Sequence, residues 1–211
     1  MKKILLSIIT IGVLSTSLFS GQNSDGAYIG LGYGVTGYSD DDYLNKELNL
    51  DNLDKSDSGF KVYGGYQFNN IVAVEGSYTD YGEFSADQSF KNKSKSFSVA
   101  ANLGYSFLDG QLRPFGIIGL GYANTSFNNY PTSTYDNSTG TYTIITPPDK
   151  GHGTIHYGLG IQYEPDILQG AGIRLAYESD IYSMTFERTG SEDKTYTESL
   201  GIAYLGIQYK F

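Results

Sequence analysis

Four charged residues stand out among those that could do chemistry. Each lies on the polar side of a segment in which apolar and polar side chains alternate: Lys61, Glu75, Arg174 and Glu178. A charge held away from water is strongly unfavourable unless an opposite charge lies against it. If these segments enclose a common interior, we expect the two cations and two anions to meet there in one network and to fill it as a structural plug.

The two histidines, His152 and His156, are candidates for general acid–base catalysis. That chemistry needs a nucleophile and an orienting acid within hydrogen-bond reach of the imidazole. The sequence around each histidine offers no clear activating acid. We therefore expect His156 to point inward as a packing or hydrogen-bonding residue, and we predict no catalytic residue and no enzymatic activity.

Metal, cofactor and nucleic-acid binding are not indicated either. Six aspartates gather in the polar segment 39–58, where carboxylates could collect Ca²⁺ or Mg²⁺, but they lack the spacing of an EF-hand loop. The chain has no cysteine for thiolate ligands, and its glycines alternate along strands instead of forming a phosphate loop. We predict no cofactor and no metal. The net charge of −9 argues against nucleic acid as a partner.

Strands are the elements that must position these residues. Apolar and polar side chains alternate with a period of two, which is typical of a strand with one apolar face. Eight segments show it: 27–35, 59–68, 72–79, 97–107, 113–123, 154–163, 171–178 and 200–211. Alternation is poor in 113–123, so the facing of that strand stays open. The 27 glycines suit tightly curved strands and a narrow interior.

Long and short connections alternate between these segments. The long ones are polar and cover 39–58, 82–95, 126–153 and 187–197; the short ones carry turn signals such as Asp109-Gly110. An even number of antiparallel strands with short turns at one end and long loops at the other is the transmembrane-barrel pattern. We predict an all-β, eight-stranded antiparallel up-and-down barrel, apolar outside and polar inside. The alternative, a soluble barrel of the lipocalin type, would have the opposite facing.

Aromatic residues gather at both ends of the segments, as the interfacial girdles of a membrane barrel require. One girdle is predicted at Tyr66, Phe68, Tyr105, Phe107, Tyr163, Tyr209 and Phe211, and the other at Tyr38, Tyr81, Phe97 and Phe186. Between them, Leu103 and Leu159 are predicted to face lipid. Residues 1–20 combine a basic start, an apolar core and a small-residue end, which predicts a secretory signal peptide followed by a barrel domain over 21–211.

The end of the chain, Tyr204-x-Gly206-x-x-Tyr209-x-Phe211, resembles the terminal signal by which outer-membrane β-barrels are recognised for insertion. With the strand pattern, it makes residues 26–211 similar to the small outer-membrane β-barrel family, which includes the transmembrane domain of outer-membrane protein A and outer-membrane protein X. The resemblance implies a place in the cell outer membrane and a monomer. It also implies contact with outer-membrane lipid and lipopolysaccharide, and assembly by the barrel-assembly machinery.

On this resemblance we expect a structural or surface-interaction role, adhesion-like, through long extracellular loops. A rigid barrel presents such loops, and loops tolerate change. The longest, 126–153, carries Tyr130, Tyr135 and Tyr142 among Ser, Thr and Asn, a composition that suits contacts with a surface ligand.

Two alternatives are a narrow pore gated by the interior charges and a lipid A-modifying barrel enzyme, in which a histidine would work with a serine. Within the second long connection, Lys91, Lys93 and Lys95 could touch lipid phosphates.

Overall fold

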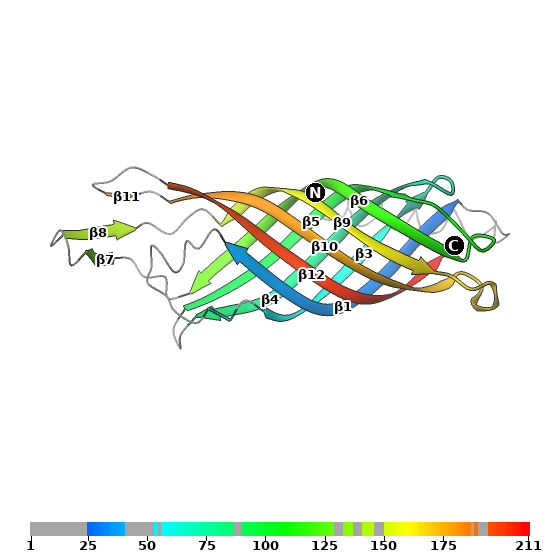
Figure 1. Ribbon diagram of the computed structural model, residues 1–211, viewed down its shortest axis with the longest axis horizontal. Coiled ribbons are helices and arrows are strands. Elements are labelled where there is room, and N and C mark those ends of the chain that lie inside the picture. The colour runs from blue at the N-terminus through cyan, green and yellow to red at the C-terminus, as the bar shows by residue number, and fades with distance from the viewer. Residues whose placement is uncertain are drawn as a thin grey trace, which may run out of the picture.

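The computed structural model is a closed β-barrel with a small sheet beyond one end (Figure 1). It describes residues 25–40, 53–54, 56–86, 90–128, 133–136, 141–145, 150–186, 188–189 and 194–211. The predicted signal peptide over 1–20 lies outside these residues. In the part of the chain that is described, no helix has the length and apolar character to cross a membrane.

Eight long strands form the wall, as predicted. They are β1 (Gly26–Asp40), β3 (Ser56–Gln67), β4 (Val72–Ala86), β5 (Phe90–Gly104), β6 (Leu112–Asn128), β9 (Gly151–Tyr163), β10 (Ala171–Phe186) and β12 (Lys194–Lys210). Each pairs antiparallel with the next long strand along the chain. The last strand closes the barrel on the first, from Tyr28 opposite Lys210 to Asp40 opposite Glu198. Every edge of the wall is therefore paired, which a sheet surrounded by lipid requires.

The cross-strand register shows how far the strands are staggered. From Phe60 on β3, paired positions lead through β1, β12, β10 and β9 to Pro114 on β6, whereas they lead through β4 and β5 to Asn124. The two endpoints are ten residues apart on one strand. Such a stagger forces the strands to tilt, and eight tilted strands leave an interior just wide enough for side chains.

The strands run further into the polar stretches than the sequence predicted. Residues 82–95 were expected to be a loop, yet β4 continues to Ala86, β5 begins at Phe90, and only a register shift between Asp80 and Glu83 interrupts their pairing. The predicted strand 72–79 is thus 72–86 in the structure. Above the lipid, the outer face of a barrel no longer has to be apolar. The hydrophobic alternation therefore ends before the backbone pairing does.

Two of the three short connections at the other end of the barrel are tight turns. Asn69 Oδ1 accepts hydrogen bonds from the backbone N–H groups of Ile71 and Val72, at 2.8 and 2.9 Å. Leu108, Asp109 and Gly110 all have positive φ, 52°, 56° and 95°. The backbone N–H of Gly110 donates to the carbonyl of Phe107, so the central residues of the turn are Leu108 and Asp109, one position before the predicted Asp-Gly pair. The third connection contains a short 3₁₀ helix, η1 (Asp166–Leu168).

Side chains alternate between an apolar outer face and a largely polar inner one. Leu103 and Leu159 point outward, 47% and 67% exposed, as predicted. Aromatic side chains face outward at the turn end too, at Tyr66, Phe68, Tyr105, Phe107, Tyr163 and Tyr209. The strand of uncertain facing, β6, turns Arg113, Phe115 and Ile117 inward. Its alternation is poor because it carries apolar residues on both faces.

The predicted girdle at the loop end is partly wrong. Tyr38 and Tyr81 are 5% and 0% exposed and point into the barrel, whereas Phe97 faces outward as predicted. The side chain of Phe186 lies outside the described residues. Aromatic type does not reveal facing here, because the barrel interior is itself rich in tyrosine. Across β3 to β6, the outward aromatic ring at this end is formed by Phe60, Tyr78, Phe97 and Tyr122.

Four short strands lie within the parts of the long connections that the structure describes. A three-stranded sheet is built from β7 (Ser133–Asp136), β8 (Thr141–Ile145) and β11 (Arg188–Thr189), in the order β11-β8-β7. It stands beyond the loop end of the barrel (Figure 1). The fourth, β2 (Leu53–Asp54), pairs with the end of β4. The third and fourth long connections are thus joined by backbone pairing between β8 and β11.

Candidate functional site

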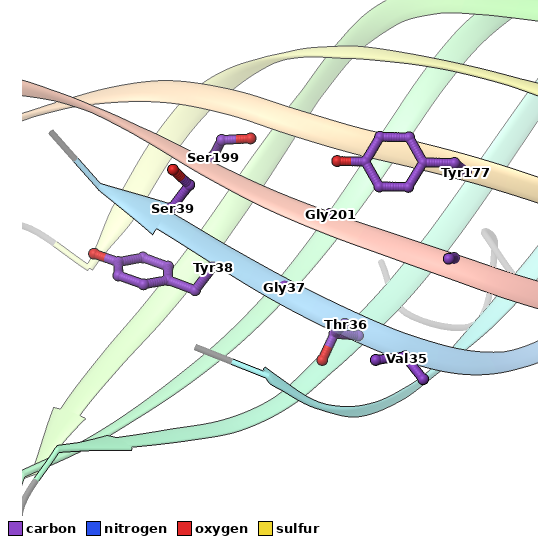
Figure 2. Close-up of a pocket in the computed structure, with 9 residues that line it drawn as sticks. Val35, Thr36, Gly37, Tyr38, Ser39, Tyr177, Ser199 and Gly201 are labelled. Carbon is purple, nitrogen blue, oxygen red and sulfur yellow. The ribbon is translucent and has the colours of Figure 1, made fainter. Parts of the chain in front are cut away.

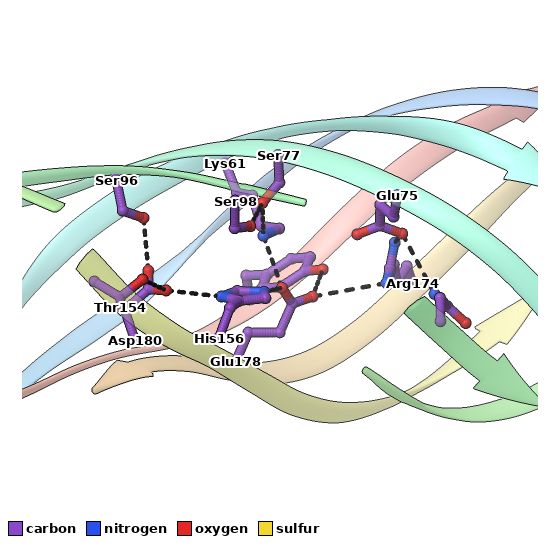
Figure 3. A network of polar contacts seen from close by, with 12 residues as sticks. Lys61, Glu75, Ser77, Ser96, Ser98, Thr154, His156, Arg174, Glu178 and Asp180 are labelled. Carbon is purple, nitrogen blue, oxygen red and sulfur yellow. Dashed lines mark hydrogen bonds and ion pairs between the residues drawn. The ribbon is translucent and has the colours of Figure 1, made fainter. Parts of the chain in front are cut away.

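The interior of the barrel holds a continuous polar network (Figure 3). The alternation of strands β3, β4, β9 and β10 turns its charged side chains inward, and the four sequence-predicted residues are all 0% or 1% exposed. The structure divides them between two ion pairs that lie next to each other, joined through Glu178.

Lys61 and Glu178 form the first pair. The Lys61 Nζ lies 2.7 Å from Glu178 Oε2 and also donates to Ser77 Oγ at 2.7 Å. Ser77 in turn shares a 2.7 Å hydrogen bond with Ser98. Tyr204 donates to the other oxygen of Glu178 at 2.6 Å. A lysine from β3 is thus fixed across the barrel to a carboxylate on β10.

Arg174 and Glu75 form the second pair, at 2.7 Å. The guanidinium lies between two aromatic rings, 4.4 Å from the centroid of Tyr63 and 4.2 Å from that of Phe115, so cation–π attraction acts on both faces. The hydroxyl of Tyr28 donates to the same Glu75 oxygen at 2.8 Å. Arg174 also lies 3.6 Å from Glu178, which connects the two pairs.

His156 extends the network toward the loop end. Its Nε2 lies 3.0 Å from Glu178 Oε2, and its Nδ1 lies 3.0 Å from Asp180 Oδ1. Ionised carboxylates only accept hydrogen bonds, so an imidazole that satisfies both carries a proton on each nitrogen. Ser96 and Thr154 donate to Asp180, at 2.6 and 3.0 Å, and not to the histidine. In this arrangement the histidine is a cation in an ion-pair chain and activates no hydroxyl.

The charges of the ion-paired residues balance. Three cations face three carboxylates: Lys61, His156 and Arg174 against Glu75, Glu178 and Asp180. A fourth buried cation, Arg113, lies nearer the turns and donates to the side chain of Asn102 at 2.8 Å and to the carbonyl of Ile71 at 3.2 Å. Within the described residues, no group of three or more potential ligand side chains is placed to hold a metal ion.

Sequence reasoning missed several members of the network. Asp180 follows Glu178 by two positions and so shares its face, and extending the alternation past residue 178 would have found it. Tyr63 and Tyr204 point toward the inner face of β1, which carries mostly glycine. These glycines leave the room that the two rings occupy, because a Cβ at Gly30 or Gly32 would clash with Tyr63 or Tyr204.

The residues of the predicted assembly signal lie on both faces of β12. Tyr204 and Gly206 are buried inside, whereas Tyr209 is 45% exposed on the outer face. The rings of Tyr209 and Phe211 meet edge to face, 5.1 Å apart, where the chain ends. Their role as an assembly signal stays a prediction.

A hollow lies in the outer wall near the loop end, between β1, β12 and β10 (Figure 2). It measures about 300 Å³ and has Gly37 and Gly201 in its lining. The ring of Tyr177 reaches over Gly201, and Ser39 and Ser199 line the side toward the loops.

Comparison with known proteins places this fold. OprG of Pseudomonas aeruginosa superposes with a TM-score of 0.54 at 12% identity, over 92% of this chain and 99% of that one. Neisserial surface protein A superposes with a TM-score of 0.54 at 14% identity, over 88% of this chain and 97% of that one. Ail of Yersinia pestis superposes with a TM-score of 0.49 at 20% identity, over 89% of this chain and 99% of that one. At such identities the likeness to OprG and to neisserial surface protein A shows the fold alone. No curated protein matches the chain.

The family assignment rests on the sequence match. The sequence model of the outer membrane protein beta-barrel domain matches residues 6–211, nearly the whole chain. The closed eight-stranded barrel and its outward apolar face agree with that match. The protein therefore belongs to the outer-membrane β-barrel domain family and is an integral protein of the outer membrane.

Proposed function

We propose that the barrel is a rigid base from which the extracellular loops contact surfaces or ligands outside the cell, without enzymatic activity. The observation that carries this proposal is the filled interior. Lys61, Arg174 and Glu178 are each 0% exposed and bonded across the lumen, so the middle of the barrel is occupied by fixed side chains. A barrel built in this way is suited to hold its ends in place.

The sheet outside the barrel supports the same proposal. Strands β7 and β8 form a hairpin in the third long connection, and β8 pairs with β11 in the fourth. Joining two loops through backbone hydrogen bonds restricts both, and a restricted loop loses less entropy when it binds. The sheet is thus suited to contact a ligand, and its strands contain Tyr135 and Tyr142.

The experiment removes this element and keeps the barrel. Residues 133–145 are replaced by a short Gly-Ser linker, and folding is checked by the different gel mobility of heated and unheated samples. Binding of whole cells to host-cell and abiotic surfaces is then compared with that of cells carrying the unaltered protein. Asn70→Ala, in a turn at the opposite end, serves as the control. We expect the deletion to fold and to lose binding, whereas unchanged binding by a folded deletion would contradict the proposal.

A narrow gated pore is the second candidate, and the placement of Arg174 favours it. This guanidinium has two carboxylates in reach, Glu75 at 2.7 Å and Glu178 at 3.6 Å, so a change of partner would rearrange the centre of the lumen. Conductance in planar bilayers tests this candidate. If the exchange of Arg174 between carboxylates gates the pore, Glu75→Gln should change the fraction of time for which the pore is open. If the barrel does not conduct, neither the unaltered protein nor this variant should give a current.

A further inference from the structure

The loop end of the wall carries a strip of basic side chains on its outer face. Lys91, Lys93 and Lys95 occupy alternate positions of β5 and are 49%, 56% and 51% exposed. The residues between them point into the barrel and are buried. We call these three residues the lysine ladder.

The height of the lysine ladder is set by the aromatic ring below it. Phe97 is the next outward residue on β5, and its paired neighbours Tyr78 and Tyr122 also face outward. Such rings mark the boundary between hydrocarbon and headgroups. A strand rises about 3.3 Å per residue and leans by about 40°. Lys95 and Lys93 therefore start roughly 5 and 10 Å above that boundary, in the headgroup layer.

The rest of the wall is neutral at this height. Among the described residues of the other strands except β4, no outward position toward the loop end carries a charged side chain. The residues there include Ser39, Ser58, Asn124, Ser183 and Thr197. The positive charge is thus concentrated on one side of the barrel, where a headgroup would meet three ammonium groups in a row.

Two carboxylates on β4 hold the lysine ladder in place. Glu83 pairs with Lys91 and with Lys93, the latter at 3.0 Å, and Asp80 pairs with Lys95 at 3.0 Å. The carboxylates are less exposed than the amines, 27% and 21%. Hydrogen bonds from the two ammonium groups lower the pKa of the Glu83 carboxyl, so it is ionised at neutral pH.

These pairs leave binding capacity on the outer side. Three cations and two carboxylates leave one net positive charge. Each ammonium has three donors, and its ion pair uses only part of them, so donors remain free to turn outward. Alternate residues of a strand lie about 7 Å apart, which gives the lysine ladder a span of about 13 Å, long enough for more than one phosphate.

We propose that the lysine ladder is a binding site for the phosphate groups of a phosphorylated glycolipid in the outer leaflet. The ammonium groups donate to phosphate oxygens, while Phe97, Tyr78 and Tyr122 contact the start of the acyl chains. Bound phosphate competes with Glu83 for the same amines. The proposal depends on the barrel being in the outer membrane and is independent of what the loops bind.

The test counts lipids bound to the full mature chain. The folded protein in uncharged detergent is titrated with lipid A that carries two phosphates and, separately, with dephosphorylated lipid A, and bound lipid is read by native mass spectrometry. The variant Lys91→Gln/Lys93→Gln/Lys95→Gln should bind the phosphorylated lipid at least about fivefold more weakly, the factor that one unneutralised lysine contributes beside an anionic headgroup layer. Its binding of the dephosphorylated lipid should not change. Lys210→Gln, which removes one lysine at the other end of the barrel, is the control.

A second variant separates lipid binding from a purely structural role. Glu83→Gln frees two of the amines, so it should strengthen binding of the phosphorylated lipid. A purely structural pairing predicts no gain. If the triple variant fails to fold, Glu83→Gln and Lys93→Gln decide the matter, with opposite shifts expected.

Two results would overturn the proposal. One is equal binding of both lipids by the unaltered protein. The other is displacement of the lipid by millimolar inorganic phosphate or a soluble sulfated oligosaccharide alone, which would assign the lysine ladder to a soluble polyanion.

Discussion

Replacing Glu178 by Gln tests whether the interior network holds the barrel together. The carboxylate of Glu178 accepts hydrogen bonds from His156 at 3.0 Å and Tyr204 at 2.6 Å, and it pairs with Lys61 at 2.7 Å. A neutral amide keeps the size of the side chain but removes the charge that balances two buried cations. It also turns NH₂ donors toward groups that are donors themselves.

The magnitude follows from burial. Lys61 and Glu178 are both 0% exposed, and removing one partner of a buried ion pair costs about 3–5 kcal/mol. The matched control is Glu83→Gln, which breaks pairs on the outer wall with lysines that are about half exposed. Exposed pairs contribute about 0–1 kcal/mol. We therefore expect the two variants to differ by about 3 kcal/mol in their free energy of unfolding.

The assay is urea unfolding in detergent, read from the gel mobility of folded and unfolded chains. Circular dichroism is the second signal, since the protein has no tryptophan. The double variant Lys61→Met/Glu178→Gln should recover part of the loss, because it removes the stranded cation as well. Equal losses for Glu178→Gln and Glu83→Gln would refute the reasoning and show that water or rearrangement compensates the interior charges.

Three further predictions concern the wall. Leu159→Arg places a charge in the lipid and should lower the free energy of unfolding by roughly 2–4 kcal/mol, whereas Thr139→Arg in a predicted loop should lower it little. Both changes are measured from the midpoints of urea unfolding, and equal losses would mean that the outward and inward faces of the strands are assigned the wrong way round. Deleting Phe211 should impair assembly in cells while leaving secretion intact, and normal assembly would remove the support for a terminal signal. Gly32→Ala should cost about 1–3 kcal/mol because its methyl group meets the ring of Tyr204, and Tyr204→Leu in the same chain should relieve part of that loss.

The strands of the wall could be predicted because contact with lipid imposes a residue pattern that is visible in the sequence. Every outward residue between the aromatic rings must be apolar, so the period of two appears wherever the wall meets hydrocarbon. The same rule explains the error in strand length. Above the lipid, β4 and β5 remain paired, but the outer face is in contact with polar surroundings there, so charged residues such as Lys93 and Glu83 can occupy outward positions that would be apolar within the hydrocarbon.

The interior was predictable only in part. Charged residues on a strand's inner face had to find partners, so a network among Lys61, Glu75, Arg174 and Glu178 could be anticipated. The pairing itself could not, because it depends on the ten-residue stagger, which sets which strands meet at one height. For the same reason the contacts between inward tyrosines and glycines could not be predicted. Gly30 on β1 leaves room for the ring of Tyr63 on β3 because the strand register brings the two residues together, and their spacing in the sequence does not indicate this.

The ion pairs of the interior and those of the outer wall use the same residue types but differ in consequence. Lys61 and Glu178 have no water to exchange with, so their separation is unfavourable and their geometry is held, which makes the barrel rigid. Lys93 and Glu83 face the headgroup layer, where a lipid phosphate can replace the carboxylate at little cost. Rigidity in the lumen and exchange on the rim are complementary. A wall that does not deform would keep the lysine ladder at one depth in the membrane and hold the sheet beyond the loop end at a constant height above it.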